Sequence, residues 1–248
     1  MTSDRRARQA KTSNFCSTEP MMTIKLTYFD IQGVAEKVRL ALVLAGIPFE
    51  DVRVSNAEWG AMKLSTPYGQ LPLMEIDGGK PIAQSEAMLR YVGSLATAKG
   101  IPLYPTSDPD RLLAIEEACG LIGDLQREWR VPVGIGFQDP TLYGYPPDFR
   151  GTEAHSAVVK AVRAKFCTEE LPKYMGFLSK RLSASGGFLC GAEPTIADCS
   201  LVPVLARFIS GGVDHVPRDC LEPYPEVVAY LQRFMAIEAV KEWYAPKE

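Results

Sequence analysis

The pattern of apolar and polar residues divides the chain into two parts, and the first part begins with a strand and a helix. "TIKLTYF" (residues 23–29) alternates apolar and polar side chains, as a half-buried strand does. The next apolar residues recur at helical spacing and predict a helix with one apolar face: Val34, Val38, Ala41, Leu42 and Ala45. Gly46 and Pro48 end this helix.

A second strand, a hairpin and another helix complete the first part. "FEDVRV" (49–54) predicts a strand that is parallel to the first if the intervening helix is a right-handed crossover. "LPLMEIDG" and "KPIAQ" predict two short strands around the turn "DGGK", and "SEAMLRYVGSLATAKG" predicts a helix. The order β-α-β then β-β-α, with a proline before the third strand, is that of a thioredoxin-like α/β domain, here residues 23–99.

The second part, residues 108–248, follows the Pro-rich linker "GIPLYPTSDPD" and predicts an all-α helical domain. Helical periodicity runs through "RLLAIEEACGLIGDLQREW", "TEAHSAVVKAVRAKFCTEELPKYMGFLSKRL" and "TIADCSLVPVLARF". The last of these begins with Thr195 and Asp198, whose spacing is that of a capping box. Residues 131–151, rich in Gly, Pro and aromatic residues, predict a long loop that is either a wall or lid of a substrate pocket or a surface insertion.

Composition excludes several classes of function. The net charge of -3 and the absence of a basic run interleaved with aromatics argue against a nucleic-acid partner. No apolar run approaches the ~20 residues of a membrane span, so we expect no membrane partner. Residues 1–22 are polar and mildly basic and predict a disordered extension; an organelle transit peptide is the alternative, which Asp4 and Glu19 weaken.

Cysteine and histidine usage narrows the chemistry further. The six cysteines are scattered without a C-x-x-C pair, which predicts reduced thiols in a reducing compartment, the cytoplasm. Only His155 and His215 are available for a metal site or a Ser-His triad, so we expect no metal. A thioredoxin-like redox protein carries its C-x-x-C between the first strand and helix, where this chain reads "YFDIQG", so disulfide exchange at this corner is excluded.

From residue 23 onward the sequence resembles the cytosolic glutathione transferases. The resemblance is carried by several motifs in order: "LTYFDIQGVAEKVRLAL", "AEWGAMK", "TPYGQLPLMEIDG", "QSEAMLRY" and "TIADCSL". Among the classes of this family the chain looks most like the tyrosine-type sigma class, with mu next. The resemblance implies glutathione as co-substrate, a glutathione-binding first domain and a second-substrate pocket in the helical domain.

The resemblance also implies a role for individual residues at the predicted corner and along the hairpin. Tyr28 would donate a hydrogen bond to the glutathione sulfur, which favours the thiolate. Leu71 and Pro72 match a cis-proline turn whose backbone pairs with the cysteinyl part of glutathione. Gln84 and Ser85 stand where a strand meets a helix; Ser85 would cap that helix, and its N-terminus would receive the γ-glutamyl carboxylate.

Further residues match the family's glutathione contacts. Trp59 and Lys63 match residues near the glycyl end, with Lys63 supplying positive charge to its carboxylate. Gln70 matches another contact. Asp124, on the first long helix of the second part, matches an acid that reaches the γ-glutamyl amine across a dimer, so the resemblance implies a homodimer. Glu36 and Arg39, one helical turn apart, are interpreted as a structural ion pair.

One departure from the pattern and two alternative functions remain open. Sigma-class sequences carry arginines on both sides of the glycine after the first strand, whereas this chain has Gln32 and Val34 there. The leading hypothesis is conjugation of the glutathione thiolate to hydrophobic electrophiles. The alternatives are a prostaglandin-isomerising or peroxide-reducing specialisation, and a non-catalytic, crystallin-like protein. The second-substrate pocket is expected to be lined by the corner after Tyr28, the helix beginning near Arg111, the 131–151 loop and the C-terminal "WYAPKE".

Overall fold

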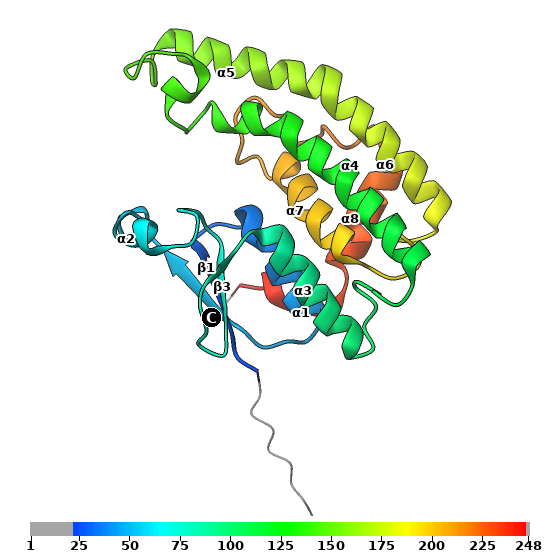
Figure 1. Cartoon of the computed structure of the whole chain (residues 1–248). Coiled ribbons are helices and arrows are strands. Elements are labelled where there is room, and N and C mark those ends of the chain that lie inside the picture. The colour runs from blue at the N-terminus through cyan, green and yellow to red at the C-terminus, as the bar shows by residue number, and fades with distance from the viewer. Residues whose placement is uncertain (1–21, 247–248) are drawn as a thin grey trace, which may run out of the picture.

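The computed structural model describes residues 22–246, and in it the chain forms a sheet with its helices and, beside them, a stack of longer helices (Figure 1). The predicted extension over residues 1–22 therefore lies, except for Met22, outside the described residues, as does the question of a transit peptide. The fold prediction, a thioredoxin-like α/β part followed by an all-helical part, is confirmed.

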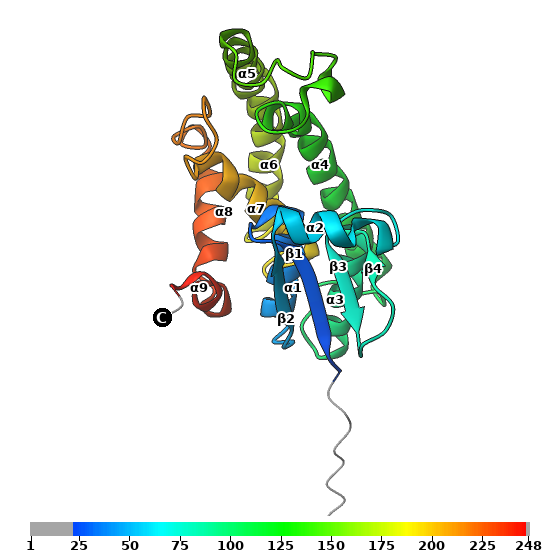
Figure 2. The ribbon, with the colours of Figure 1, turned by 90° about the vertical axis from the view of Figure 1, so that its left-hand side faces the viewer.

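A mixed sheet of four strands forms the centre of the first part. The strands are β1 Ile24–Phe29, β2 Glu50–Val54, β3 Leu73–Ile76 and β4 Ile82–Ala83, in the spatial order β2-β1-β3-β4. β1 pairs parallel with β2, as the crossover argument predicts, and antiparallel with β3. Helices α1 Glu36–Leu44 and α3 Ser85–Ala98 lie between the sheet and the helical part, while α2 Asn56–Met62 follows β2 (Figures 1 and 2).

The second part consists of helices only among the described residues. They are α4 Pro109–Gly134, α5 Glu153–Lys165, α6 Leu171–Ser185, α7 Ile196–Ile209, α8 Pro225–Met235 and α9 Glu238–Tyr244. A π-helical turn, Phe166–Glu170, joins α5 to α6, since Pro172 lacks the N–H that would continue a regular α-helix. The buried α7 packs against α1, α3 and α4 and so connects the two parts.

The predicted capping box at the start of α7 is present. The carboxylate of Asp198 accepts hydrogen bonds from the backbone N–H and hydroxyl of Thr195, at 2.7 and 2.9 Å. It also accepts one from the backbone N–H of Leu189, at 2.9 Å. Because Asp198 is fully buried, these donors replace the water that the carboxylate loses on folding. The pair acts in folding, as the sequence predicts.

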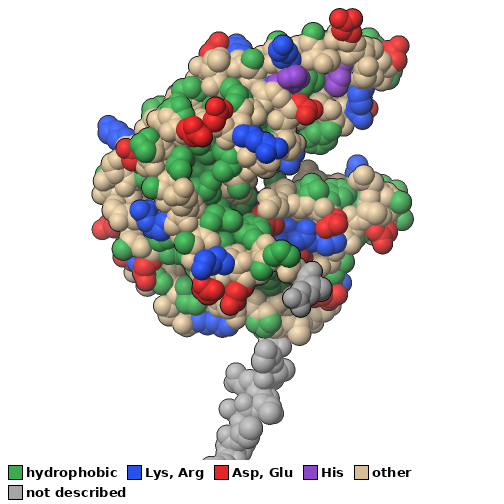
Figure 3. Space-filling model, turned by 180° about the vertical axis from the view of Figure 1, so that it is seen from behind, with side chains coloured by type: hydrophobic (Ala, Val, Ile, Leu, Met, Phe, Trp, Pro, Cys, Tyr) green, Lys and Arg blue, Asp and Glu red, His purple; other side chains and the backbone are tan. Residues whose placement is uncertain are grey.

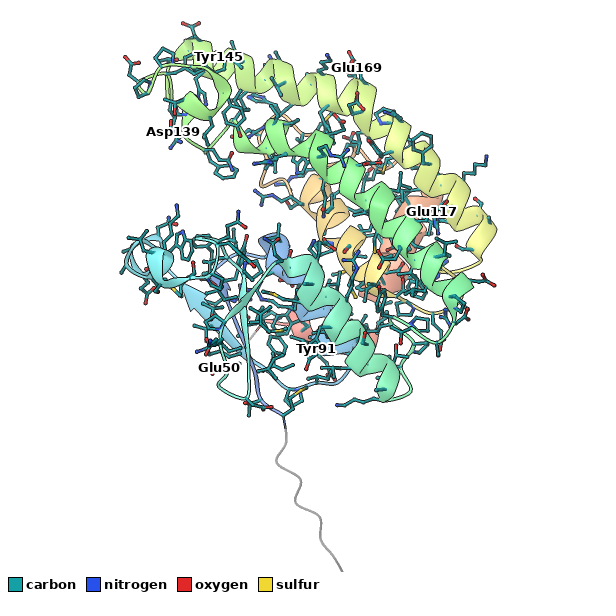
Figure 4. All side chains as sticks on the ribbon, viewed as in Figure 1. Glu50, Tyr91, Glu117, Asp139, Tyr145 and Glu169 are labelled. Carbon is teal, nitrogen blue, oxygen red and sulfur yellow. The ribbon has the colours of Figure 1, made fainter. Side chains whose placement is uncertain are left out.

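The expected 131–151 loop is partly helical. Residues 131–134 extend α4, and Pro140–Tyr143 form a short 3-10 turn. Pro132 lies in the last turn of α4, where its carbonyl has no intrahelical donor, and Arg163 of α5 donates to it from Nε at 2.9 Å. Figure 4 shows Asp139 and Tyr145 in this segment, at the outer end of the α4–α5 hairpin.

The predicted pair of Glu36 and Arg39 is confirmed and belongs to a larger buried network. Arg39 Nη1 lies 3.0 Å from Glu36 Oε2, and Arg39 Nε lies 2.9 Å from Asp51 Oδ1 of β2. The indole Nε1 of Trp243, in α9, donates to the other oxygen of Glu36 at 2.9 Å. Two charges with almost no exposure are thus paired and hydrogen-bonded, which is what buried charges require.

Candidate active site

Tyr28 lies at the carboxyl end of β1, where the chain turns toward α1. Its side chain is 8% exposed, and its hydroxyl oxygen accepts a hydrogen bond from the backbone N–H of Val34 at 3.4 Å. Gly33 makes this contact possible, since it has φ +48° and a Cβ there would lie 2.6 Å from the Tyr28 oxygen. Because the oxygen accepts from the backbone, the hydroxyl proton is left to donate to a ligand.

Arg39 supports the corner from behind. Its guanidinium carbon lies 5.8 Å from the centroid of the Tyr28 ring, and its Nη1 donates to the carbonyls of Ile31 and Gln32, each at 3.1 Å. Burial raises the pKa of Tyr28, while the Val34 N–H and the charge of Arg39 act in the opposite direction. The net shift is upward, so Tyr28 stays protonated and remains a donor at neutral pH.

The Tyr28 hydroxyl borders a cavity of about 690 Å³ between the corner and the helical part. In the space-filling view a deep notch separates these two parts of the molecule (Figure 3). The corner contributes residues 31–34 and Lys37, and the segment after α4 contributes Phe137. Two helices each contribute residues at the i, i+3, i+4 and i+7 positions of one face: Gln126, Trp129, Arg130 and Val133 from α4, and Ser200, Pro203, Val204 and Arg207 from α7.

The pocket wall differs from the predicted one in two places. The corner, α4 and the 131–151 segment contribute as expected, the last through Val133 and Phe137. The C-terminal residues Trp243 to Pro246 do not line the cavity; Trp243 is held by Glu36 and packs on Phe49, with ring centroids 5.6 Å apart. Helix α7, which was not expected in the wall, lines the cavity instead. Its helical stripe was visible in the sequence, but periodicity alone does not tell a cavity wall from a core face.

Val34 was expected on the buried face of the first helix, and this is wrong. The α-helix starts only at Glu36, and Val34 lies in the 3-10 turn Gly33–Ala35, where its side chain is 46% exposed and lines the cavity. A 3-10 turn has three residues per turn, so Val34 does not continue the α-helical face that Val38 and Ala41 share. The valine therefore faces the ligand space instead of the core.

The expected cis peptide between Leu71 and Pro72 is present. It lies just before β3, and neither the N–H nor the C=O of Leu71 forms a backbone hydrogen bond within the described residues. These two groups are therefore available to an extended peptide, which could pair with them as an added strand.

The start of α3 differs from the prediction. Gln84, with φ 77°, is the N-cap of α3, and Ser85 is the first helical residue, so Ser85 does not cap the helix. The positive φ of Gln84 turns the chain into the helix one residue earlier than a serine cap would. The N–H groups of Ser85 and Glu86 have no backbone acceptor within residues 22–246, and they leave an anion-binding helix N-terminus.

The remaining predicted glutathione contacts lie outside the Tyr28 cavity. Trp59 packs edge-to-face on Phe29, 6.2 Å between centroids, and the exposed Lys63 lies on the turn after α2. Gln70 and Gln84 are brought together by a 3.4 Å hydrogen bond between their side chains. Asp124 also lies outside this cavity; it is half exposed on α4 and pairs with Arg127 at 2.9 Å.

Other chemistry is scarce in the described residues. No cluster of three or more His, Cys, Asp or Glu side chains able to hold a metal occurs among them. The five cysteines of residues 22–246 are free, and burial raises the pKa of the Cys119 thiol to about 12.

Among residues 22–246 no helix combines the length and apolar character that a membrane crossing needs. A second hollow, of about 590 Å³ at the start of β1, contains Lys25 and Glu75, which pair with each other at 2.7 Å.

Comparison with known proteins gives a consistent result over both parts of the chain. Residues 24–94 match the family described as "Glutathione S-transferase, N-terminal domain", and residues 152–247 match "Glutathione S-transferase, C-terminal domain". The chain is 30% identical over 227 residues to glutathione S-transferase 1 of Ascaris suum, covering 92% of this chain and 98% of that protein. It is 28% identical to glutathione S-transferase S1 of Drosophila melanogaster, covering 88% of this chain and 76% of that protein.

Solved structures agree with the sequence matches. The crystal structure of the glutathione S-transferase from Ascaris lumbricoides is 28% identical, with a TM-score of 0.66 over 91% of this chain and 98% of that one. A structure of prostaglandin synthase D of Nilaparvata lugens gives a TM-score of 0.72 over 91% of this chain and 100% of that one; at 24% identity this likeness concerns the fold.

Proposed function

Because this chain belongs to the glutathione S-transferase family, we propose that it conjugates the thiolate of glutathione to hydrophobic electrophiles and that Tyr28 activates the thiol. One observation carries the proposal. The Tyr28 hydroxyl is held at the edge of a largely apolar cavity with its oxygen accepting from Val34 N–H, so that its proton is directed to a ligand. The protein is an enzyme whose co-substrate is glutathione.

Glutathione would lie along the edge formed by Leu71 and the start of α3. The unpaired N–H and C=O of Leu71 suit the cysteinyl backbone, and the free N–H groups at Ser85 and Glu86 suit the γ-glutamyl carboxylate. Lys63 would supply positive charge to the carboxylate of the glycyl end. These contacts bind and orient the tripeptide so that its sulfur faces the Tyr28 hydroxyl.

The conjugation reaction then requires only that the glutathione thiol is activated and that it lies close to the acceptor. The thiol loses its proton to solvent, and the Tyr28 O–H donates to the resulting thiolate, which shifts the thiol pKa downward from ~8.5. The sulfur forms a bond to the electrophilic carbon, and the displaced pair of electrons leaves with a departing group or moves to an electron-withdrawing atom of the acceptor. No covalent intermediate with the protein is required, because both reactants are held side by side.

Replacement of Tyr28 by Phe tests the proposal. The variant should keep its affinity for glutathione and lose about 10- to 100-fold in turnover, since one charge-assisted hydrogen bond to sulfur disappears and little contact area changes. Tyr145→Phe is the matched control, because Tyr145 lies at the outer end of the α4–α5 hairpin, stacked on Phe149 (Figure 4). Conjugation rates of the Tyr28 variant equal to those of the control would remove Tyr28 from the mechanism.

The proposal also covers the oligomeric state of the protein and its class within the glutathione S-transferase family. We propose a two-fold homodimer in which Asp124 of one subunit reaches the γ-glutamyl amine bound to the other. Its side chain is half exposed on α4 and does not line the Tyr28 cavity of its own chain, which supports this role. Sedimentation velocity combined with activity measurement tests it: an active monomer would contradict the shared site. The assignment to the sigma class, with mu next, rests on the sequence motifs.

The two alternative functions have distinct signatures. A crystallin-like protein would retain the fold without turnover, so retention on a glutathione resin and a conjugation assay separate it from an enzyme. A prostaglandin-isomerising or peroxide-reducing specialisation uses the same thiolate on a different acceptor, and the likeness to the Nilaparvata lugens structure, at 24% identity, adds only the fold. Assays with an endoperoxide and a hydroperoxide therefore accompany the conjugation assay.

A further inference from the structure

The cavity beside Tyr28 carries positive charge without a matching negative charge. Three of its lining residues are basic, Lys37, Arg130 and Arg207, and in the described part of the chain no aspartate or glutamate lines it. Lys37 is already neutralised by an ion pair with Glu86. The guanidinium groups of Arg130 and Arg207 form neither an ion pair nor a hydrogen bond with the residues in the range 22–246, and they are therefore left to pair with a ligand.

The two unpaired arginines stand at the same level of the cavity, at its outer end. Trp129 of α4 and Phe208 of α7 pack edge-to-face with centroids 5.0 Å apart, which fixes the neighbouring Arg130 and Arg207 at matching heights on the two helices. The opposite end of α7 lies beside α3 and the linker that follows it, since the Ile196 side chain lies against Gly93 and the N–H of Ile196 donates to the Leu103 carbonyl at 3.0 Å. The arginines therefore lie at the end of the cavity that is far from the sheet.

Ser200 marks the inner end. It lies one turn into α7 and two turns before Arg207 on the same face, so about 10 Å of helix separates the two residues. Ser200 is 4% exposed, and its hydroxyl is buried without a hydrogen-bond partner in the described residues. A buried hydroxyl that lines a cavity and lacks a partner indicates a polar atom of a ligand at this end.

From this arrangement we infer that the preferred acceptor is an amphipathic carboxylic acid. Its electrophilic carbon and a polar atom, such as a carbonyl oxygen, would lie at the Tyr28 and Ser200 end, and its carboxylate would lie about 10 Å away between Arg130 and Arg207. Trp129, Val133, Val204 and Phe137 would cover the apolar body between them. The inference rests on the proposed conjugation and specifies the class of its second substrate.

The test compares an acid with its neutral ester. The probes are a vinyl ketone that carries a terminal carboxylate on a saturated chain about 10 Å long, and the methyl ester of the same compound. The wild-type enzyme should conjugate the acid with a kcat/KM at least about 10-fold above that of the ester. Arg130→Gln and Arg207→Gln should each reduce this preference several-fold, and in the double variant the acid and the ester should react with similar kcat/KM.

Controls separate a specific carboxylate site from general electrostatics. Lys180→Gln removes one charge from an exposed position of α6 that does not line the cavity, and it should leave the acid-to-ester ratio unchanged. Equal rates for acid and ester in the wild type, or a preference that survives in the double variant, would overturn the inference.

A binding measurement distinguishes failure of this inference from failure of the proposed function. Calorimetric titration with decanoate and with methyl decanoate requires no conjugation, so it reports on the two arginines even in a chain without turnover. Tighter binding of decanoate that is lost in the double variant supports the carboxylate site; equal binding of both probes refutes it. Absence of conjugation with every electrophile, together with no affinity for glutathione, would instead refute the proposed function.

Discussion

Replacing Gly33 by Ala should disable Tyr28 without touching it. A Cβ at this position would lie 2.6 Å from both the hydroxyl oxygen and Cε1 of Tyr28, which is closer than non-bonded atoms can approach. The tyrosine ring must therefore move, and its hydroxyl leaves the Val34 N–H that now fixes it at 3.4 Å. A displaced hydroxyl no longer points its proton at the position of the glutathione sulfur.

The expected size of the effect follows from two separate terms. Alanine at φ +48° costs about 1 to 2 kcal/mol of folding stability, because a Cβ is unfavourable in the left-handed region. Loss of a hydrogen bond to a charged sulfur costs about 1.5 to 3 kcal/mol, which raises the pKa of the bound thiol by about 1 to 2 units. At neutral pH the conjugation rate should fall about 10- to 100-fold, and affinity for glutathione should change little.

Gly46→Ala is the control that separates the loss of thiol activation from the loss of folding stability. Gly46 has a similar φ, +56°, but a Cβ there meets no atom within 4 Å, so this variant carries the backbone strain alone. Thermal melts should show a loss of stability in both variants, and a larger one in Gly33→Ala because the buried Tyr28 ring must also move. Thiolate absorbance of bound glutathione, followed against pH, should shift only in Gly33→Ala. If both variants titrate alike, the position of the Tyr28 hydroxyl does not control the thiol, and the argument from this corner fails.

Three further predictions concern the same site. Val34→Arg should lower the pKa of the bound thiol by about 0.5 to 1 unit without loss of stability, since the side chain at this position is 46% exposed; an unshifted titration in a folded variant would contradict it. Ser85→Ala should weaken glutathione binding by about 1 to 3 kcal/mol in calorimetry yet leave the melting temperature nearly unchanged, because Gln84 and not Ser85 is the N-cap. The pH profile of kcat should rise through the thiol pKa and show no decline below about pH 10, because burial raises the pKa of Tyr28 and keeps it a donor.

The order of the elements could be predicted from the sequence because each strand and helix has its own periodicity. The parallel pairing of β1 with β2, the hairpin β3–β4 and the capping box at Thr195 all follow from local pattern. The cis peptide at Pro72 came from resemblance to a family, since spacing alone does not distinguish cis from trans.

Positions governed by one backbone angle could not be predicted in the same way. Val34 lies in a 3-10 turn that starts at Gly33, a residue with positive φ, and it lines the cavity instead of sharing the expected apolar face. Gln84, also with positive φ, takes the N-cap position that was expected for Ser85. A glutamine gives no signal for such an angle, because the left-handed region is mainly occupied by glycine and asparagine. The contribution of α7 to the cavity was not predicted, because tertiary packing decides whether a helix face meets a neighbour or a cavity.

The hydrogen bond from Trp243 to Glu36 has a consequence for synthesis of the chain. Glu36 belongs to the corner that positions Tyr28, yet its second carboxylate oxygen is satisfied by a residue of the last helix, α9 (Figure 2). At a translation rate of about 5 to 20 residues per second, Trp243 emerges on the order of ten seconds after the end of α3. During that interval the carboxylate stays hydrated, so the corner reaches its final form only when the chain is nearly complete.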